Sequence, residues 1–206
     1  MQKIMFNDRY HLTRMAVKGV KTNTRRIEGD RQFQLAATAA EDFTYEEATG
    51  CVVMCCQGIE IFRHKCRYKV GEIVAVAQSY RDIFKGMKQD DSRRAKYADE
   101  KYTPGYGNKM YVRADMMIEH IRIKGVRCER LQDISDEDCM KEGVVAMADF
   151  KTRGCSRKLF ALPRCEYAQI FNTPRRAFAA LIDKVSGRGT WDRNPWVVVY
   201  EFELVK

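Results

Sequence analysis

Apolar and polar positions along the chain predict strands in several segments. Apolar residues fill 51–56 and recur at 59–62, and Gln57-Gly58 between them suits a tight turn, so this region predicts a β-hairpin. The continuous apolar run Ile73–Ala77 is typical of a buried strand, here one inside a barrel. Similar patterns predict further strands at 110–113, 120–131 and 197–204.

Helices are predicted where apolar residues recur at helical spacing between a capping residue at the start and a glycine at the end. A weaker pattern predicts a short helix over 33–40. The three better-bounded helices cover about 8–18, ended by Gly19; the segment after the N-cap Ser135, ended by Gly143; and the segment from Thr173-Pro174 to Gly187. Strands and helices together predict an α+β fold.

Three stretches interrupt this pattern, at about 28–65, 81–108 and 148–171, and we expect them to be insertions into a single domain spanning 1–206. In 81–108, charges of both signs alternate with few aliphatic residues. Two interpretations of that stretch stay open, a mobile lid and a solvated loop, and charge runs generally favour the loop.

Composition restricts the class of protein. With 206 residues, 45% hydrophobic and 32% charged, the chain is long and apolar enough to bury a full core. No apolar run approaches the roughly 20 residues of a membrane span, and residues 1–8 lack the apolar stretch of a secretory signal. We therefore expect a cytoplasmic protein with no membrane partner. The formal charge of +9 favours anionic partners, with nucleic acid the first candidate.

The chain contains eight cysteines but no Cys-x-x-Cys pair. Without a secretion signal, disulfides are not expected, and His64 and Cys66 with Cys55 and Cys56 form the only cluster with any resemblance to a zinc site. We expect no metal and no cofactor, and all eight thiols reduced: Cys51, Cys55, Cys56, Cys66, Cys128, Cys139, Cys155 and Cys165.

The segment 19–26 concentrates candidate chemistry, because it places a lysine, two hydroxyls and two guanidiniums within six residues. Strict strand alternation would put Lys21 and Thr24 on opposite faces, whereas a twist or bulge near Gly19 would bring them to one cleft. A cation beside a hydroxyl suits an oxyanion, a phosphate, or the deprotonation of a threonine. The other interpretation is a basic, solvated edge strand.

The spacing Gly19-x-Lys21-x-x-Thr24-x-Arg26 resembles the signature of ASCH domains, which belong to the PUA-like superfamily. Three further segments, 68–76, 127–143 and 191–196, follow in the family's order, and the last two resemble the longer ASCH proteins of bacteria and their phages. The resemblance implies a small, partly open β-barrel with flanking helices and inserted loops. It also implies a cleft where the basic strand meets the helix that ends at Gly143.

The same resemblance implies candidate functions. The PUA-like superfamily recognises RNA and modified bases, so we expect an RNA, nucleoside or nucleotide ligand in a basic cleft, contacted by Asn23, Arg25 and Arg26. One branch of ASCH proteins deacetylates acetylated cytidine with a lysine, a threonine and a glutamate. The matching residues are Lys21, Thr24 and Glu142.

The alternative function is therefore a hydrolase acting on an acylated nucleoside or on RNA. In it, Lys21 accepts the proton of Thr24, Thr24 attacks the carbonyl, and Glu142 protonates the leaving amine. Without the resemblance, the position of Glu142 in the last turn of a helix predicts that its side chain is exposed at the surface. The chain is about twice as long as the small deacetylating members and continues Arg25-Arg26-Ile27 where they become acidic, so the substrate is left open.

Overall fold

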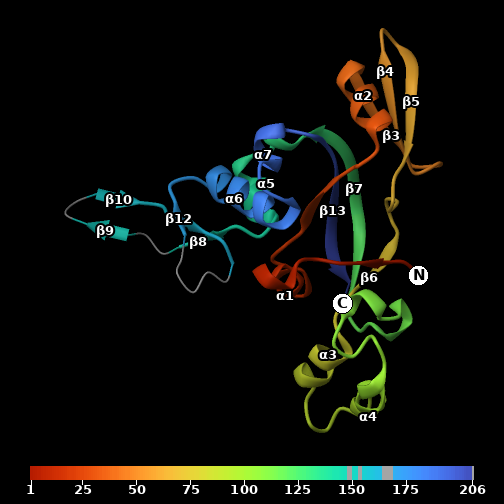
Figure 1. Cartoon of the computed structure of the whole chain (residues 1–206), viewed down its shortest axis with the longest axis vertical. Coiled ribbons are helices and arrows are strands. Elements are labelled where there is room, and N and C mark those ends of the chain that lie inside the picture. The colour runs from red at the N-terminus through yellow and green to blue at the C-terminus, as the bar shows by residue number, and fades with distance from the viewer. Residues whose placement is uncertain (148–149, 153–154, 164–168, 206) are drawn as a thin grey trace.

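The computed structural model describes residues 1–147, 150–152, 155–163 and 169–205. A long, curved sheet forms the centre of the molecule (Figure 1). Helices α5 (Asp136–Lys141), α6 (Pro174–Ser186) and α7 (Thr190–Arg193) gather on one side of it. A hairpin unit and a pair of short helices occupy the two ends of the long axis.

The central sheet has five strands in the order β1-β6-β7-β13-β2. β1 and β6 are parallel, and the other neighbours are antiparallel. Residues Val197–Tyr200 of β13 are completely buried, as expected for a strand with neighbours on both edges and cover on both faces. The strands are β1 (Lys3–Ile4), β2 (Asn23–Ile27), β6 (Ile73–Val76), β7 (His120–Arg130) and β13 (Trp196–Val205).

The α+β class predicted from the sequence is confirmed. Among the described residues the strands form four sheets, and none of them closes into a barrel. The strand predicted at 73–77 is present as β6, but it lies in an open sheet next to β1 and β7. The PUA-like assignment stays a proposal.

The capping residues predicted from the sequence begin and end two of the helices. The hydroxyl of Ser135 accepts a hydrogen bond from the backbone N–H of Asp138, and that of Thr173 accepts one from Arg176. Gly143 ends α5 with φ of 116°, and a Cβ there would lie 2.9 Å from Cδ2 of Leu12 in α1 (Leu12–Val17). A side chain at position 143 would therefore strain both the backbone and the α1–α5 contact.

The hairpin unit consists of α2 (Arg31–Ala39) packed on the three-stranded sheet β3-β4-β5. The short helix and the hairpin are both confirmed, with β4 at Cys51–Cys56 and β5 at Ile59–Lys65. Strand β3 (Asp42–Glu46) was not predicted. The ring of Phe33 packs edge-on against His64, which joins the helix to the sheet.

The solvated-loop interpretation of 81–108 is wrong, whereas the mobile-lid interpretation stays a prediction. Helices α3 (Tyr80–Gly86) and α4 (Arg94–Asp99) form there. Tyr97 and Ile83 are buried in a second, smaller core with Val112 and Met116. The strand predicted at 110–113 is also wrong, because Lys109–Tyr111 forms a 3₁₀ turn.

The remaining elements are short. The insertion predicted at 148–171 lies partly outside the described residues. No helix in the described ranges combines the length and apolar character that a membrane span requires. The short strands are β8 (Val145–Ala146), β9 (Phe150–Thr152), β10 (Cys155–Arg157), β11 (Phe160–Ala161) and β12 (Ile170–Phe171), and the other 3₁₀ turns are Asp8–Tyr10, Glu100–Tyr102, Ala114–Met116 and Leu131–Asp133.

Candidate functional site

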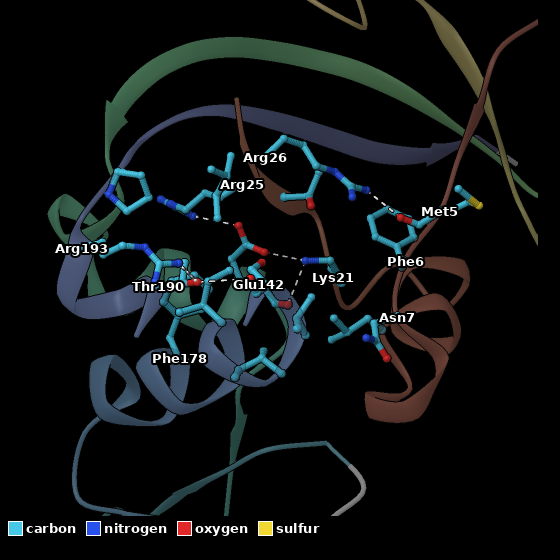
Figure 2. Close-up of a pocket in the computed structure, with 18 residues that line it drawn as sticks. Met5, Phe6, Asn7, Lys21, Arg25, Arg26, Glu142, Phe178, Thr190 and Arg193 are labelled. Carbon is cyan, nitrogen blue, oxygen red and sulfur yellow. Dashed lines mark hydrogen bonds and ion pairs between the residues drawn. The ribbon is translucent and has the colours of Figure 1, made fainter. Parts of the chain in front are cut away.

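A cavity of about 450 Å³, called here the site pocket, lies between the N-terminal segment, β2 and the helices α6 and α7 (Figure 2). This volume is within the range of small-molecule sites. The lining residues are Met5, Phe6, Asn7, Leu12, Lys21, Thr24, Arg25, Arg26, Ile27, Glu142, Phe178, Leu181, Ile182, Val185, Ser186, Thr190, Arg193 and Pro195.

The turn at Gly19 brings the basic segment into the pocket. Gly19 has φ of 70°, and the next two backbone N–H groups, of Val20 and Lys21, both donate to the carbonyl of Met15. β2 begins only at Asn23, so Lys21 lies before the strand. The alternation of side chains between the two faces of a strand therefore does not apply to it. For this reason Lys21 and Thr24 line the same pocket, and the solvated edge-strand interpretation is wrong for them.

The ammonium group of Lys21 lies against the carboxylate of Glu142, with Nζ 2.7 Å from Oε2. Lys21 Nζ also donates to the backbone carbonyls of Asn23 (2.6 Å) and Glu142 (2.9 Å). Burial lowers the pKa of Lys21, and the neighbouring carboxylate of Glu142 opposes that shift. Since three acceptors surround Nζ, all three protons of the charged form are engaged.

Glu142 is only 5% exposed, so the prediction of a surface residue from its helix position alone is wrong. It lies at the C-terminal end of α5, where the helix dipole disfavours a carboxylate. The ammonium of Lys21 offsets this, because it contacts both the carboxylate and the backbone carbonyl of Glu142. Figure 2 shows the two side chains pointing toward one another, with their contact drawn as a dashed line.

Arg25 lies on the other side of Glu142 and contacts three carboxylates. Its guanidinium donates to Glu142 at 3.1 Å, to Glu129 at 2.7 Å and to Asp138 at 2.8 Å, and its side chain is 1% exposed. Arg127 extends the network by pairing with Glu129 and Asp138 and, at the surface, with Glu201. Only Nη1 of Arg25 contacts Glu142, while Nε and Nη2 donate to Glu129 and Asp138, and the predicted contact of Arg25 with a ligand stays a prediction.

The remaining predicted residues have different surroundings. Thr24, 5% exposed and paired with Tyr200 across β2 and β13, lines the pocket. Asn23 does not line it. The backbone carbonyl of Asn23 accepts from Lys21, while its side-chain Nδ2 is buried without a hydrogen-bond partner among the described residues. Arg26 lines the pocket and donates to the carbonyl of Met5 at 2.7 Å.

Sequence reasoning missed most of the apolar lining. Phe178, Leu181, Ile182 and Val185 were predicted as the core-facing stripe of a helix, and the first three are indeed buried. Val185 is 38% exposed although it lies on the same stripe and lines the pocket. The sequence signal that could have predicted this lining is an apolar helix stripe that continues past the buried residues. Phe6 and Arg193 had no distinguishing pattern.

His64 and the cysteines named with it are not gathered into a metal site. Within the described ranges, no group of three or more His, Cys, Asp or Glu side chains is placed to hold a metal ion. His64 instead lies 3.8 Å from Glu28. The side chains of Cys155 and Cys165 lie outside the described part of the chain, and the six described thiols are free: Cys51, Cys55, Cys56, Cys66, Cys128 and Cys139.

Burial raises the pKa of the Cys66, Cys128 and Cys139 thiols to about 12. Since the thiolate is the reactive form, we expect these three to react with a disulfide reagent at pH 8 far more slowly in the native protein than after unfolding. Peptide mass spectrometry after brief labelling measures this directly. Rapid native labelling of Cys139 would contradict the packing described here.

Comparison of the chain with protein-family models, with curated proteins and with solved structures finds no match.

Proposed function

We propose that the protein binds a modified nucleoside or nucleotide in the site pocket. The observation that supports this most is the combination of size and lining in one cavity. About 450 Å³ is room for one nucleoside-sized ligand. The lining combines apolar side chains, among them Phe6, Phe178 and Leu181, with the polar side chains of Thr24, Arg26 and Glu142.

These two kinds of lining side chain suit the two chemistries of a nucleobase. The ring faces are apolar and pack well against aromatic and aliphatic side chains. The base edge has donors and acceptors, which match the carboxylate of Glu142 and the hydroxyl of Thr24. Because Thr24 is only 5% exposed, a ligand that offers its hydroxyl no partner would leave it unpaired, and selectivity follows from that cost.

Isothermal titration calorimetry with acetylcytidine, cytidine and related modified nucleosides tests this proposal. Val185→Trp places an indole at the partly exposed edge of the pocket and should weaken binding at least ~10-fold by excluding the ligand. The matched control is Leu35→Trp, on the exposed face of α2 and outside the lining, which should bind as the wild type does. Failure of every nucleoside and nucleotide to bind would refute the proposal.

A second candidate function is hydrolysis of an acyl amide on that ligand. It is favoured by one specific observation, that Thr24 and the Lys21–Glu142 pair line the same cavity. Transfer of one proton within the pair gives a neutral amine and a carboxylic acid, and the 2.7 Å contact provides the path. Burial of Lys21 favours its neutral form.

The hydrolytic steps then balance. Thr24 Oγ1 bonds to the acyl carbon as its proton passes to Lys21. The C–N bond breaks as Glu142 protonates the leaving amine, which leaves an ester on Thr24 and restores the ion pair. Water then attacks the ester, its proton passes to Glu142, and Lys21 returns a proton to Thr24.

Binding ranks above hydrolysis because of the present contacts of Lys21. All three acceptors around its ammonium belong to Asn23 and Glu142, and none to Thr24. A general base must contact the proton that it removes. Hydrolysis therefore requires bound substrate to release one of these hydrogen bonds, whereas binding requires no rearrangement.

A further inference from the structure

The site pocket is lined by more positive than negative groups. Among its described lining residues, Lys21, Arg25, Arg26 and Arg193 are cationic, and Glu142 is the carboxylate. The buried cations differ in how far their donors are already used. The ammonium of Lys21 has three acceptors, and each guanidinium nitrogen of Arg25 donates to a carboxylate.

Arg26 differs from both. Its guanidinium donates one hydrogen bond, to the carbonyl of Met5. Among the described residues no carboxylate forms an ion pair with Arg26, although the charge of Glu142 acts on it from a greater distance. A guanidinium has five N–H donors and remains charged at physiological pH. A half-buried charge with no carboxylate in direct contact is costly to maintain, so the position of Arg26 in a ligand-sized cavity favours an anion from outside the protein.

The surroundings of Arg26 define the place of that anion. Its Cζ lies 5.8 Å from the centroid of the Phe6 ring, and Nζ of Lys21 lies 5.6 Å from the same centroid. The two cations therefore both border Phe6, as Figure 2 shows. An anion held by Arg26 also benefits from the charge of Lys21, although the protons of Lys21 are already engaged.

We infer that Arg26 binds a phosphate group of the ligand, so that the pocket takes nucleotides in preference to nucleosides. This inference rests on the proposed function and specifies its ligand. The planar fork of a guanidinium matches two phosphate oxygens, and a phosphate supplies the missing counter-charge. The edge of a neutral base would satisfy one or two donors but would leave the charge uncompensated.

Arg193 extends the positive charge to the outside of the pocket. It is exposed, and its guanidinium donates to the Thr190 hydroxyl at 2.9 Å and to the carbonyl of Arg188 at 3.4 Å. The phosphate can come from a free nucleotide, as a monoester, or from an oligonucleotide, as a diester. Both present the same oxygens to Arg26, and the experiment distinguishes them.

The test compares the affinities of the best-binding nucleoside, its 5′-monophosphate and a short oligoribonucleotide containing it, measured by calorimetry. We expect the wild type to bind at least one phosphate-bearing form about 10–100-fold more tightly than the nucleoside. Arg26→Gln should remove that preference, so that the nucleoside and its phosphate-bearing forms bind this variant with similar affinity. Arg26→Lys, which keeps the charge without the fork, should retain part of the preference.

The matched control is Arg122→Gln on the exposed face of β7, which should keep the full preference. Thermal unfolding of each variant verifies that it is folded. Tighter binding of the monophosphate assigns a free nucleotide, and tighter binding of the oligoribonucleotide alone assigns a strand. Equal affinity of the wild type for all three forms would overturn this inference and leave the proposed function standing, whereas no binding of any form would overturn both.

Discussion

Replacing Arg25 by methionine should lower the free energy of unfolding by about 3–5 kcal/mol. The change leaves Glu129, Asp138 and Glu142 crowded together without the guanidinium that separates them. Removing one partner of a buried ion pair costs this much because the opposing charges stay buried. Chemical denaturation of wild type and variant, fitted with a common slope, measures the difference.

A second substitution tests the cause. If like-charge repulsion produces the loss, adding Asp138→Asn to Arg25→Met should recover part of the stability, because one of the three negative charges is removed. The matched control is Arg122→Met, whose exposed partner Glu203 lies 3.9 Å away, and which should unfold at the wild-type midpoint. Arg25→Met unfolding together with Arg122→Met would show that the network adds little to stability.

Thr24→Val is expected to separate binding from hydrolysis. Valine keeps the shape of threonine and removes its hydroxyl. If Thr24 is the nucleophile, turnover of an acylated nucleoside should fall ~10³-fold or more while ligand affinity changes little. If the protein only binds, the substitution should weaken binding by one hydrogen bond, about 0.5–1.5 kcal/mol. The measurements are release of acetate from acetylcytidine and calorimetric affinity.

Thr44→Val is the matched control, because Thr44 is an exposed residue on β3 outside the pocket lining. It should alter neither turnover nor affinity. A wild type that hydrolyses no acylated nucleoside, yet binds nucleosides or nucleotides, would retire the hydrolytic candidate and keep the binding proposal. Unchanged turnover in Thr24→Val would instead exclude Thr24 as the nucleophile.

Local signals predicted the elements that have strong boundaries. Ser135, Thr173 and Gly143 fixed helix ends because their effects act within one turn of backbone. The hairpin at Gln57-Gly58 was equally local. The helices of 80–99 were missed because their apolar residues are few, and Tyr97 and Ile83 are buried only through contacts with Val112 and Met116, far along the chain.

The site was predicted unevenly for the same reason. The family resemblance connected Lys21 and Thr24 with Glu142, which lies 121 positions after Lys21, and the structure does bring the three to one pocket. Without it, Glu142 was predicted to be exposed, because helix position alone gives no sign of a distant ammonium. The role of Arg25 was also unpredictable, since its three carboxylates come from β7, α5 and the end of α5.

The pocket lining comes from 5–27, from Glu142 and from 178–195, so neither the hairpin unit nor the α3–α4 pair contributes to it. These two units lie at opposite ends of the molecule. The molecule is thus divided into a ligand-holding part and two outlying modules that can be engineered separately. A reporter domain can accordingly be inserted at the exposed β4–β5 turn, Gln57-Gly58, without changing any residue that lines the pocket.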